Sequence, residues 1–183
     1  MLEALRIVGH LLLGRTHLWQ YYTNITWRTC EGCLAWHGRI APRPEAFPDP
    51  GDDCESKLLK FPVWELAAYR EKGRLMRKLA QEELWRRETF RKAEALLPSQ
   101  PEEALRLFDQ AGAVDLYIPE LERLAVGQRE LLARDPGLRA ALREVFLRRW
   151  SGKFAKPRYE RLPERMRQAR ERWGEGRIKE LFP

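Results

Sequence analysis

Three cysteines and one histidine near the N-terminus are the residues whose types and spacing could do chemistry. Cys30 and Cys33 form a C-x-x-C step, His37 follows four residues later, and Cys54 returns after a proline-containing stretch. Zinc prefers soft thiolate and imidazole donors, and in structural sites four such ligands enclose it completely. The sequence therefore predicts a structural zinc site with Cys30, Cys33, His37 and Cys54 as its ligands.

Other interpretations of these cysteines stay open. They could be inert reduced thiols or form a disulfide, because free cysteine is a common core residue. Cys30 and Cys33 could instead form a redox pair, although the flanking sequence lacks the βαβ pattern that usually accompanies that motif. A metal with four protein ligands has no open coordination position, which disfavours a catalytic metal.

The segment around the cysteines resembles part of a known family. A strand-like run at 19–27 leads into Thr29-Cys30, and Phe47-Pro48-Asp49-Pro50 leads towards Cys54. Over roughly residues 16–57 this resembles the cysteine-rich segment of phage minor head (head-morphogenesis) proteins of the Mu type. The family usually closes this segment with a histidine and two cysteines, whereas this chain has Asp52-Asp53-Cys54-Glu55. The resemblance implies a metal-knuckle element and phage descent.

The elements that must position the cysteines differ on either side of Cys54. Residues 1–15 are predicted to form a short helix, with Leu2, Leu5, Val8 and Leu12 on one face. After Cys54 the pattern becomes helical. A helix is expected to begin near Val63, to bend or break near Gly73 because glycine weakens a helix, and to stop at Pro98.

Helix-start signals divide the rest of the chain. Ser99 and Glu102 are predicted to form a capping box, and Asp135 is predicted to cap a helix that Pro136 opens. Together the elements predict a mainly α protein, a helical bundle with a small N-terminal β-containing zinc-knuckle-like element (α+β). We expect three parts: the N-terminal helix, strand and knuckle at 1–62, a helical bundle at 63–150, and a basic helical tail at 151–183.

Positive charge is concentrated at the C-terminal end of the chain. Residues 147–183 hold 12 Lys+Arg and 5 Asp+Glu, which accounts for the whole net charge of +7. Aromatic residues are interleaved with these cations, and basic residues with aromatics can track a nucleic-acid backbone and stack on its bases. The alternative is that the arginines form helical ion pairs and that Trp150 and Trp173 dock the tail on the bundle. The candidate nucleic-acid contacts are Arg148, Arg149, Lys153, Lys156, Arg158 and Arg165.

Composition and the absence of catalytic motifs narrow the class of protein. The balance of charged and apolar residues is that of a globular chain, and no apolar run in the sequence is long enough to cross a membrane. Glu3 and His10 interrupt any signal-peptide pattern, so we expect a cytoplasmic protein without membrane contact. Asn24 is the only asparagine, a thermophile-like bias that GC-rich coding would also produce. The sequence has no phosphate-binding glycine loop, nucleophile elbow or H-E-x-x-H motif, so an enzyme is not expected.

Three functions remain from the sequence. The first is a non-catalytic, zinc-stabilised interaction or scaffolding protein, with a protein partner and phage descent. The second is a nucleic-acid-binding protein that uses residues 147–183. The third is a thiol redox protein that uses Cys30 and Cys33.

Overall fold

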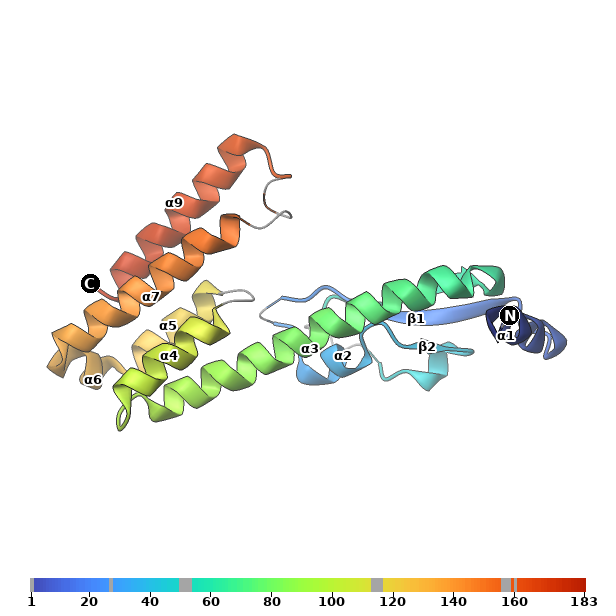
Figure 1. Cartoon of the computed structure of the whole chain (residues 1–183), viewed down its shortest axis with the longest axis horizontal. Coiled ribbons are helices and arrows are strands. Elements are labelled where there is room, and N and C mark those ends of the chain that lie inside the picture. Colours follow the sequence, from blue (N-terminus) through green and yellow to red (C-terminus); the bar gives the residue numbers. More distant parts are fainter. Residues whose placement is uncertain (1, 27, 50–53, 113–116, 156–158, 160) are drawn as a thin grey trace. The chain divides into compact units, whose positions relative to one another are not determined.

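The computed structural model describes residues 2–26, 28–49, 54–112, 117–155, 159 and 161–183, with side chains from residue 5 onward (Figure 1). The chain forms two compact units, residues 1–84 and 85–183. The boundary lies inside the long helix α3, Leu66–Leu96, so each unit contains part of that helix. The predicted class, mainly α with a small β element, is confirmed.

A three-stranded antiparallel sheet is the centre of the first unit. β1 (His17–Thr23) lies between β2 (Ile40–Ala41) and β3 (Ser56–Pro62). In the register, Leu18 is opposite Phe61 and Tyr21 is opposite Leu58, while Trp19 is opposite Ala41. Single-turn 3-10 helices at Pro44–Ala46 and Val63–Glu65 connect these strands to their neighbours.

The two faces of the sheet have different cores, because successive side chains of a strand point to opposite faces. On one face Leu18 packs with Phe61 and Leu66, and the Phe61 ring stacks on Tyr69 of α3 at 3.9 Å. On the other face Tyr21 packs with Cys33 and Phe47, next to the short helix α2 (Glu31–Trp36). The core that contains Leu66 of α3 and the core that contains Cys33 thus lie on opposite faces of the sheet.

Two features of the first unit differ from the sequence prediction. Residues 56–62 were expected to lead into helix, but they form β3 along the whole length of β1. The N-terminal helix α1 (Leu2–Leu12) forms as predicted, but Leu5, Val8 and Leu12 are exposed and Ile7 is its contact with the core. The periodicity identified an apolar face correctly, although that face is not packed against the described residues of this chain.

The predicted bend or break at Gly73 is wrong, because α3 continues from Leu66 to Leu96. α3 passes very close to Gly38 at this point. A Cβ at position 73 would overlap the carbonyl oxygen of Gly38, so glycine is required there. Gly38 itself has a φ of +78°, which favours glycine. Nearby, Gln20 Nε2 donates to the Tyr69 carbonyl at 2.9 Å and Arg77 Nη1 donates to the Gly38 carbonyl at 2.8 Å.

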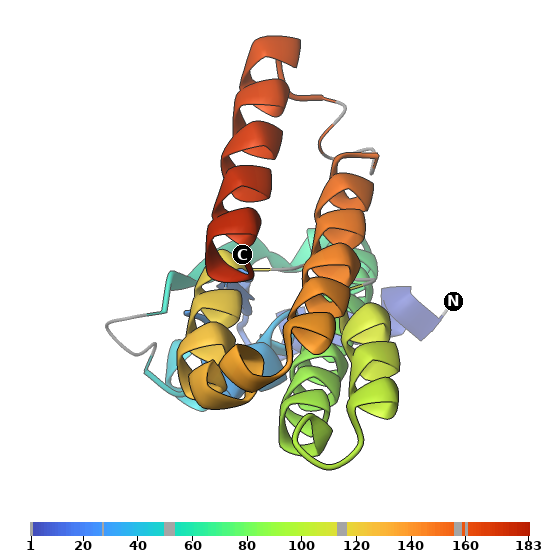
Figure 2. The same cartoon turned by 90° about the vertical axis from the view of Figure 1, so that its left-hand side faces the viewer.

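The second unit is a helical bundle (Figure 2). After the end of α3 it contains α4 (Pro101–Ala111), α5 (Ile118–Gly127), α6 (Arg129–Arg134), α7 (Pro136–Phe154) and α9 (Glu164–Leu181). A row of phenylalanine rings forms its core, since Phe108 contacts both Phe90 and Phe146, and Phe146 contacts Phe182. Residues from six helices, α3 included, therefore meet in one apolar core.

The helix starts of this unit confirm one predicted cap and correct another. Asp135 Oδ1 accepts from the Leu138 amide at 2.8 Å, so Asp135 caps α7 as predicted. The capping box at Ser99 and Glu102 does not form, because Gln100 is the N-cap residue of α4 and makes no side-chain cap. The Ser99 hydroxyl instead donates to the Leu96 carbonyl, at the end of α3.

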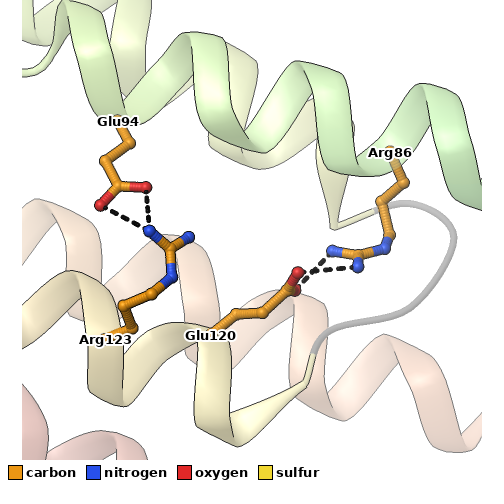
Figure 3. A network of polar contacts seen from close by, with 4 residues as sticks. All are labelled: Arg86, Glu94, Glu120 and Arg123. Carbon is orange, nitrogen blue, oxygen red and sulfur yellow. Dashed lines mark hydrogen bonds and ion pairs between the residues drawn. The ribbon is translucent and has the colours of Figure 1, made fainter. Parts of the chain in front are cut away.

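Two ion pairs join α3 to α5 within this unit (Figure 3). Arg86 donates to both carboxylate oxygens of Glu120, at 2.6 and 3.0 Å, and its side chain has no exposed surface. Arg123 donates to Glu94 in a more exposed position. The Arg86 guanidinium also lies 5.1 Å from the centroid of the Tyr117 ring.

The observed units differ from the predicted division at 62/63 and 150/151. The second predicted boundary falls inside α7, and the C-terminal helix belongs to the bundle. Trp150 Nε1 donates to the Glu171 carbonyl at 3.0 Å, and Gly174 leaves room for the Trp150 ring against α9. Trp150 therefore docks the tail on the bundle. Among the described residues, no helix combines the length and apolarity needed to span a bilayer.

Candidate metal centre

Three cysteines from two parts of the first unit meet beside the sheet. Cys30 is the N-cap residue of α2, Cys33 lies in that helix, and Cys54 lies two residues before β3. Their sulfur atoms all lie within 4.8 Å of one another, and all three are free thiols. Pairing of β3 with β1 brings Cys54 back to the C-x-x-C turn, so the fold assembles residues that are 24 positions apart.

Each sulfur has a hydrogen-bond partner from the protein. The Cys33 amide donates to Cys30 Sγ at 3.2 Å, and the Cys30 amide donates to Cys54 Sγ at 3.3 Å. The Tyr21 hydroxyl lies 3.2 Å from Cys33 Sγ. Donors that point at sulfur favour the thiolate, which is the form that binds metals.

Two thiols of the centre have pKa values displaced in opposite directions. Burial raises the pKa of Cys33, but hydrogen bonds from Ser56, Tyr21 and the neighbouring cysteines outweigh burial and lower it to about 7. At Cys54 the backbone hydrogen bond from Cys30 lowers the pKa, whereas burial and the two neighbouring thiols raise it to about 11. Tyr21 responds in turn, since burial and its bond to Cys33 raise its pKa to about 12. Of these two thiols, Cys33 therefore ionises more readily near neutral pH.

This arrangement fits a soft divalent cation. A tetrahedral zinc ion with Zn–S bonds of about 2.3 Å holds its sulfurs about 3.8 Å apart. No pair of sulfurs therefore needs to close by more than about an ångström to reach that spacing. Three cysteines close together could therefore bind a metal ion, and thiolate donors suit zinc better than magnesium or calcium.

His37 does not join the three cysteines, in contrast to the prediction. No nitrogen of its ring belongs to the cluster of candidate ligand atoms among the described residues. Its Nδ1 accepts a hydrogen bond from the Thr23 amide at 3.0 Å, and its side chain is 3% exposed. Burial lowers the pKa of His37 to about 4, so the ring is neutral at physiological pH. His37 ties the end of α2 to β1.

Sequence reasoning missed the residues that support the sulfurs. Tyr21 lies on β1, and Ser56 lies on β3, the strand that pairs with β1. Alternation along β1 does carry a signal, because Trp19, Tyr21 and Thr23 must share one face once the strand is recognised. Ser56 had no such signal, since β3 itself was not predicted.

The candidate nucleic-acid residues occupy different environments in the second unit. Arg148 and Arg149 both pair with Asp109, at 2.8 and 2.6 Å. The Lys153 ammonium lies 4.5 Å from the Trp150 ring centroid and within reach of Tyr117 and Tyr159. Arg165 is exposed on α9. Lys156 and Arg158 lie outside the described residues.

Comparison of the chain with protein-family models, with curated sequences and with solved structures finds no significant match. The cysteine centre and the two units are therefore interpreted from their own geometry.

Proposed function

We propose that this chain is a non-catalytic interaction or scaffolding protein whose first unit is stabilised by a structural zinc ion. Cys30, Cys33 and Cys54 are the protein ligands of that ion. A fourth, lighter donor atom completes the tetrahedral coordination of the ion. The observation that carries the proposal is the convergence of the three sulfurs within 4.8 Å.

The contacts of the centre support a structural role for the metal. Cys33 is buried against Tyr21 and Phe47, so the ion would join α2 to the sheet within the core that these three residues form. Zinc bound by cysteine-rich ligand sets generally contributes folding free energy, on the order of 10 kcal/mol or more in small peptides. Because the core around Cys33 is small, a metal link between α2 and the sheet adds a large share of the stability of this unit.

Phage descent and a protein partner belong to the same proposal. The strand, C-x-x-C turn and proline loop at 16–57 resemble the cysteine-rich segment of Mu-type minor head proteins, which supports a role in an assembly. The exposed apolar face of α1 adds a surface of the kind that partners cover. We place the protein in the cytoplasm, where reduced thiols favour metal over disulfide.

The test is the metal content of the full chain, purified without added zinc, and its response to a chelator. We expect one zinc per chain, and loss of it should unfold residues 1–84 while residues 85–183 stay folded, as observed by amide hydrogen exchange. Cys30→Ser and Cys54→Ser should each lose the ion, whereas His37→Asn should keep it. A metal-free protein with a reversible Cys30–Cys33 disulfide would contradict the proposal and favour the thiol redox function instead.

A further inference from the structure

The exposed face of α9 combines cations with an aromatic ring. Arg165 and Arg172 are seven residues apart and therefore lie on the same side of the helix. Trp173 is 61% exposed about a quarter turn of the helix away from both, and exposed Arg170 lies on the other side of Trp173. Figure 2 shows α9 beside α7, and Arg165 and Arg172 are both exposed.

Three of the four acidic residues of α9 lie away from Arg165 and Arg172, and the fourth, Glu180, pairs with Arg177. Glu164, Glu171 and Glu175 follow one another at spacings of seven and four, which places them together on a different flank. Glu164 pairs with Arg167, and Glu175 pairs with Lys179. These ion pairs use other cations, and among the described residues no carboxylate pairs with Arg165 or Arg170.

Trp173 is held in position although most of its surface is exposed. Its ring centroid lies 6.4 Å from that of Trp150. Trp150 is itself fixed by its hydrogen bond to the Glu171 carbonyl and by its contact with Gly174. A ring supported from one side can stack on a ligand with little loss of side-chain entropy.

A fourth cation, Lys153, lies at the end of α7, with its ammonium 4.5 Å from the ring centroid of Trp150, which also contacts Trp173. Burial lowers the pKa of Lys153 and the charge of Arg170 lowers it further, whereas Tyr159 raises it.

We propose that this face of α9 binds single-stranded nucleic acid, with Arg165 and Arg172 on phosphates and Trp173 stacked on a base. Positive charge complements the backbone, and an exposed aromatic ring gives sequence-tolerant stacking on unpaired bases. A duplex offers no unstacked base to Trp173. An anionic membrane fits less well, because Met166 and Trp173 are the exposed large apolar residues of α9, too few for the broad apolar face of an interfacial helix.

The test uses the full-length chain and a fluorescein-labelled oligothymidine of about 12 nucleotides, with anisotropy read over a series of salt concentrations. Trp173→Ala should weaken binding about 5- to 150-fold, and Trp173→Phe should retain most of the affinity. Arg165→Gln with Arg172→Gln should reduce the salt slope by about 1.4, two phosphate contacts on a single strand.

A charge-matched control distinguishes the contribution of this face from the effect of removing any two positive charges. Arg106→Gln with Arg134→Gln removes the same charge from α4 and α6, and should leave affinity and salt slope close to the parent values. Equal weakening by both double variants would overturn the proposal, as would a Trp173→Ala protein that folds and binds normally. Binding to phosphatidylserine vesicles without binding to the oligonucleotide would also overturn it, in favour of a membrane surface.

Discussion

Arg86 and Glu120 form a two-pronged ion pair between α3 and α5, and the Arg86 side chain has no exposed surface (Figure 3). A buried charge that loses its partner is costly, whereas an exposed pair contributes little. Glu120→Ala should therefore lower the free energy of unfolding by about 3–5 kcal/mol. The measurement is urea unfolding followed by circular dichroism.

The second pair between the same helices is the matched control. Glu94→Ala removes the partner of Arg123, which is 56% exposed, and should cost less than about 1 kcal/mol. An equal loss of unfolding free energy in the two variants would contradict a larger contribution from the buried Arg86–Glu120 pair.

Alanine substitutions at two glycines of α9 should change the stability of the second unit in opposite directions. Gly174→Ala would drive a Cβ into the Trp150 ring, so it should destabilise the second unit by about 1–3 kcal/mol. Gly176 has no atom within 4 Å of an added Cβ, so Gly176→Ala should stabilise by about 0.5–1 kcal/mol through helix propensity alone. Thermal unfolding of both variants checks this, and two changes of the same sign would contradict the docking of α9 on Trp150.

Acid should destabilise the first unit through His37. Its pKa is lowered to about 4 by burial, while the unfolded chain has the ordinary value of about 6.5. Between these values the unfolded state binds more protons, so the contribution is complete above pH 6.5 and is lost as the pH falls towards 4. It amounts to at most about 3 kcal/mol.

Asparagine at position 37 can accept from the Thr23 amide without titrating in this range. The difference in unfolding free energy between the parent and His37→Asn should therefore shrink or change sign from pH 7 to pH 4. A difference that is constant across this window would contradict a buried neutral His37.

Tyr21 should tune the metal affinity without being a ligand. Tyr21→Phe removes the hydroxyl 3.2 Å from Cys33 Sγ, and loss of such a supporting contact should weaken zinc binding about 10- to 100-fold. Competition with a chromophoric chelator measures this. Tyr22→Phe is the control, because the Tyr22 ring lies beside His37 and Lys57; equal losses in both variants would argue against the role of the Tyr21–Cys33 contact.

The fold class and the Cys30–Cys33 turn could be predicted because they depend on local patterns. Cys30 and Cys33 are held by one turn, and Asp135 caps its helix through the residues that follow it. What failed depends on contacts between distant residues. Gly73 lies in a continuous helix because it passes Gly38, and residues 56–62 form a strand because β1 pairs with them.

His37 illustrates the same limit at the site. Its spacing from Cys33 suits a zinc ligand, yet its Nδ1 accepts from the Thr23 amide on β1. Spacing gives the reach of a side chain but does not show which competing partner is nearer. The three cysteines meet because Cys54 is carried back by β3.

X-ray absorption at the zinc edge of the full-length protein tests the central claim most directly. We predict three sulfur neighbours at about 2.3 Å and one lighter atom at about 2.0–2.2 Å, with the same spectrum in His37→Asn and no bound zinc in Cys54→Ser. A zinc ion surrounded only by nitrogen and oxygen, or a chain that takes up no zinc at all, would contradict the account.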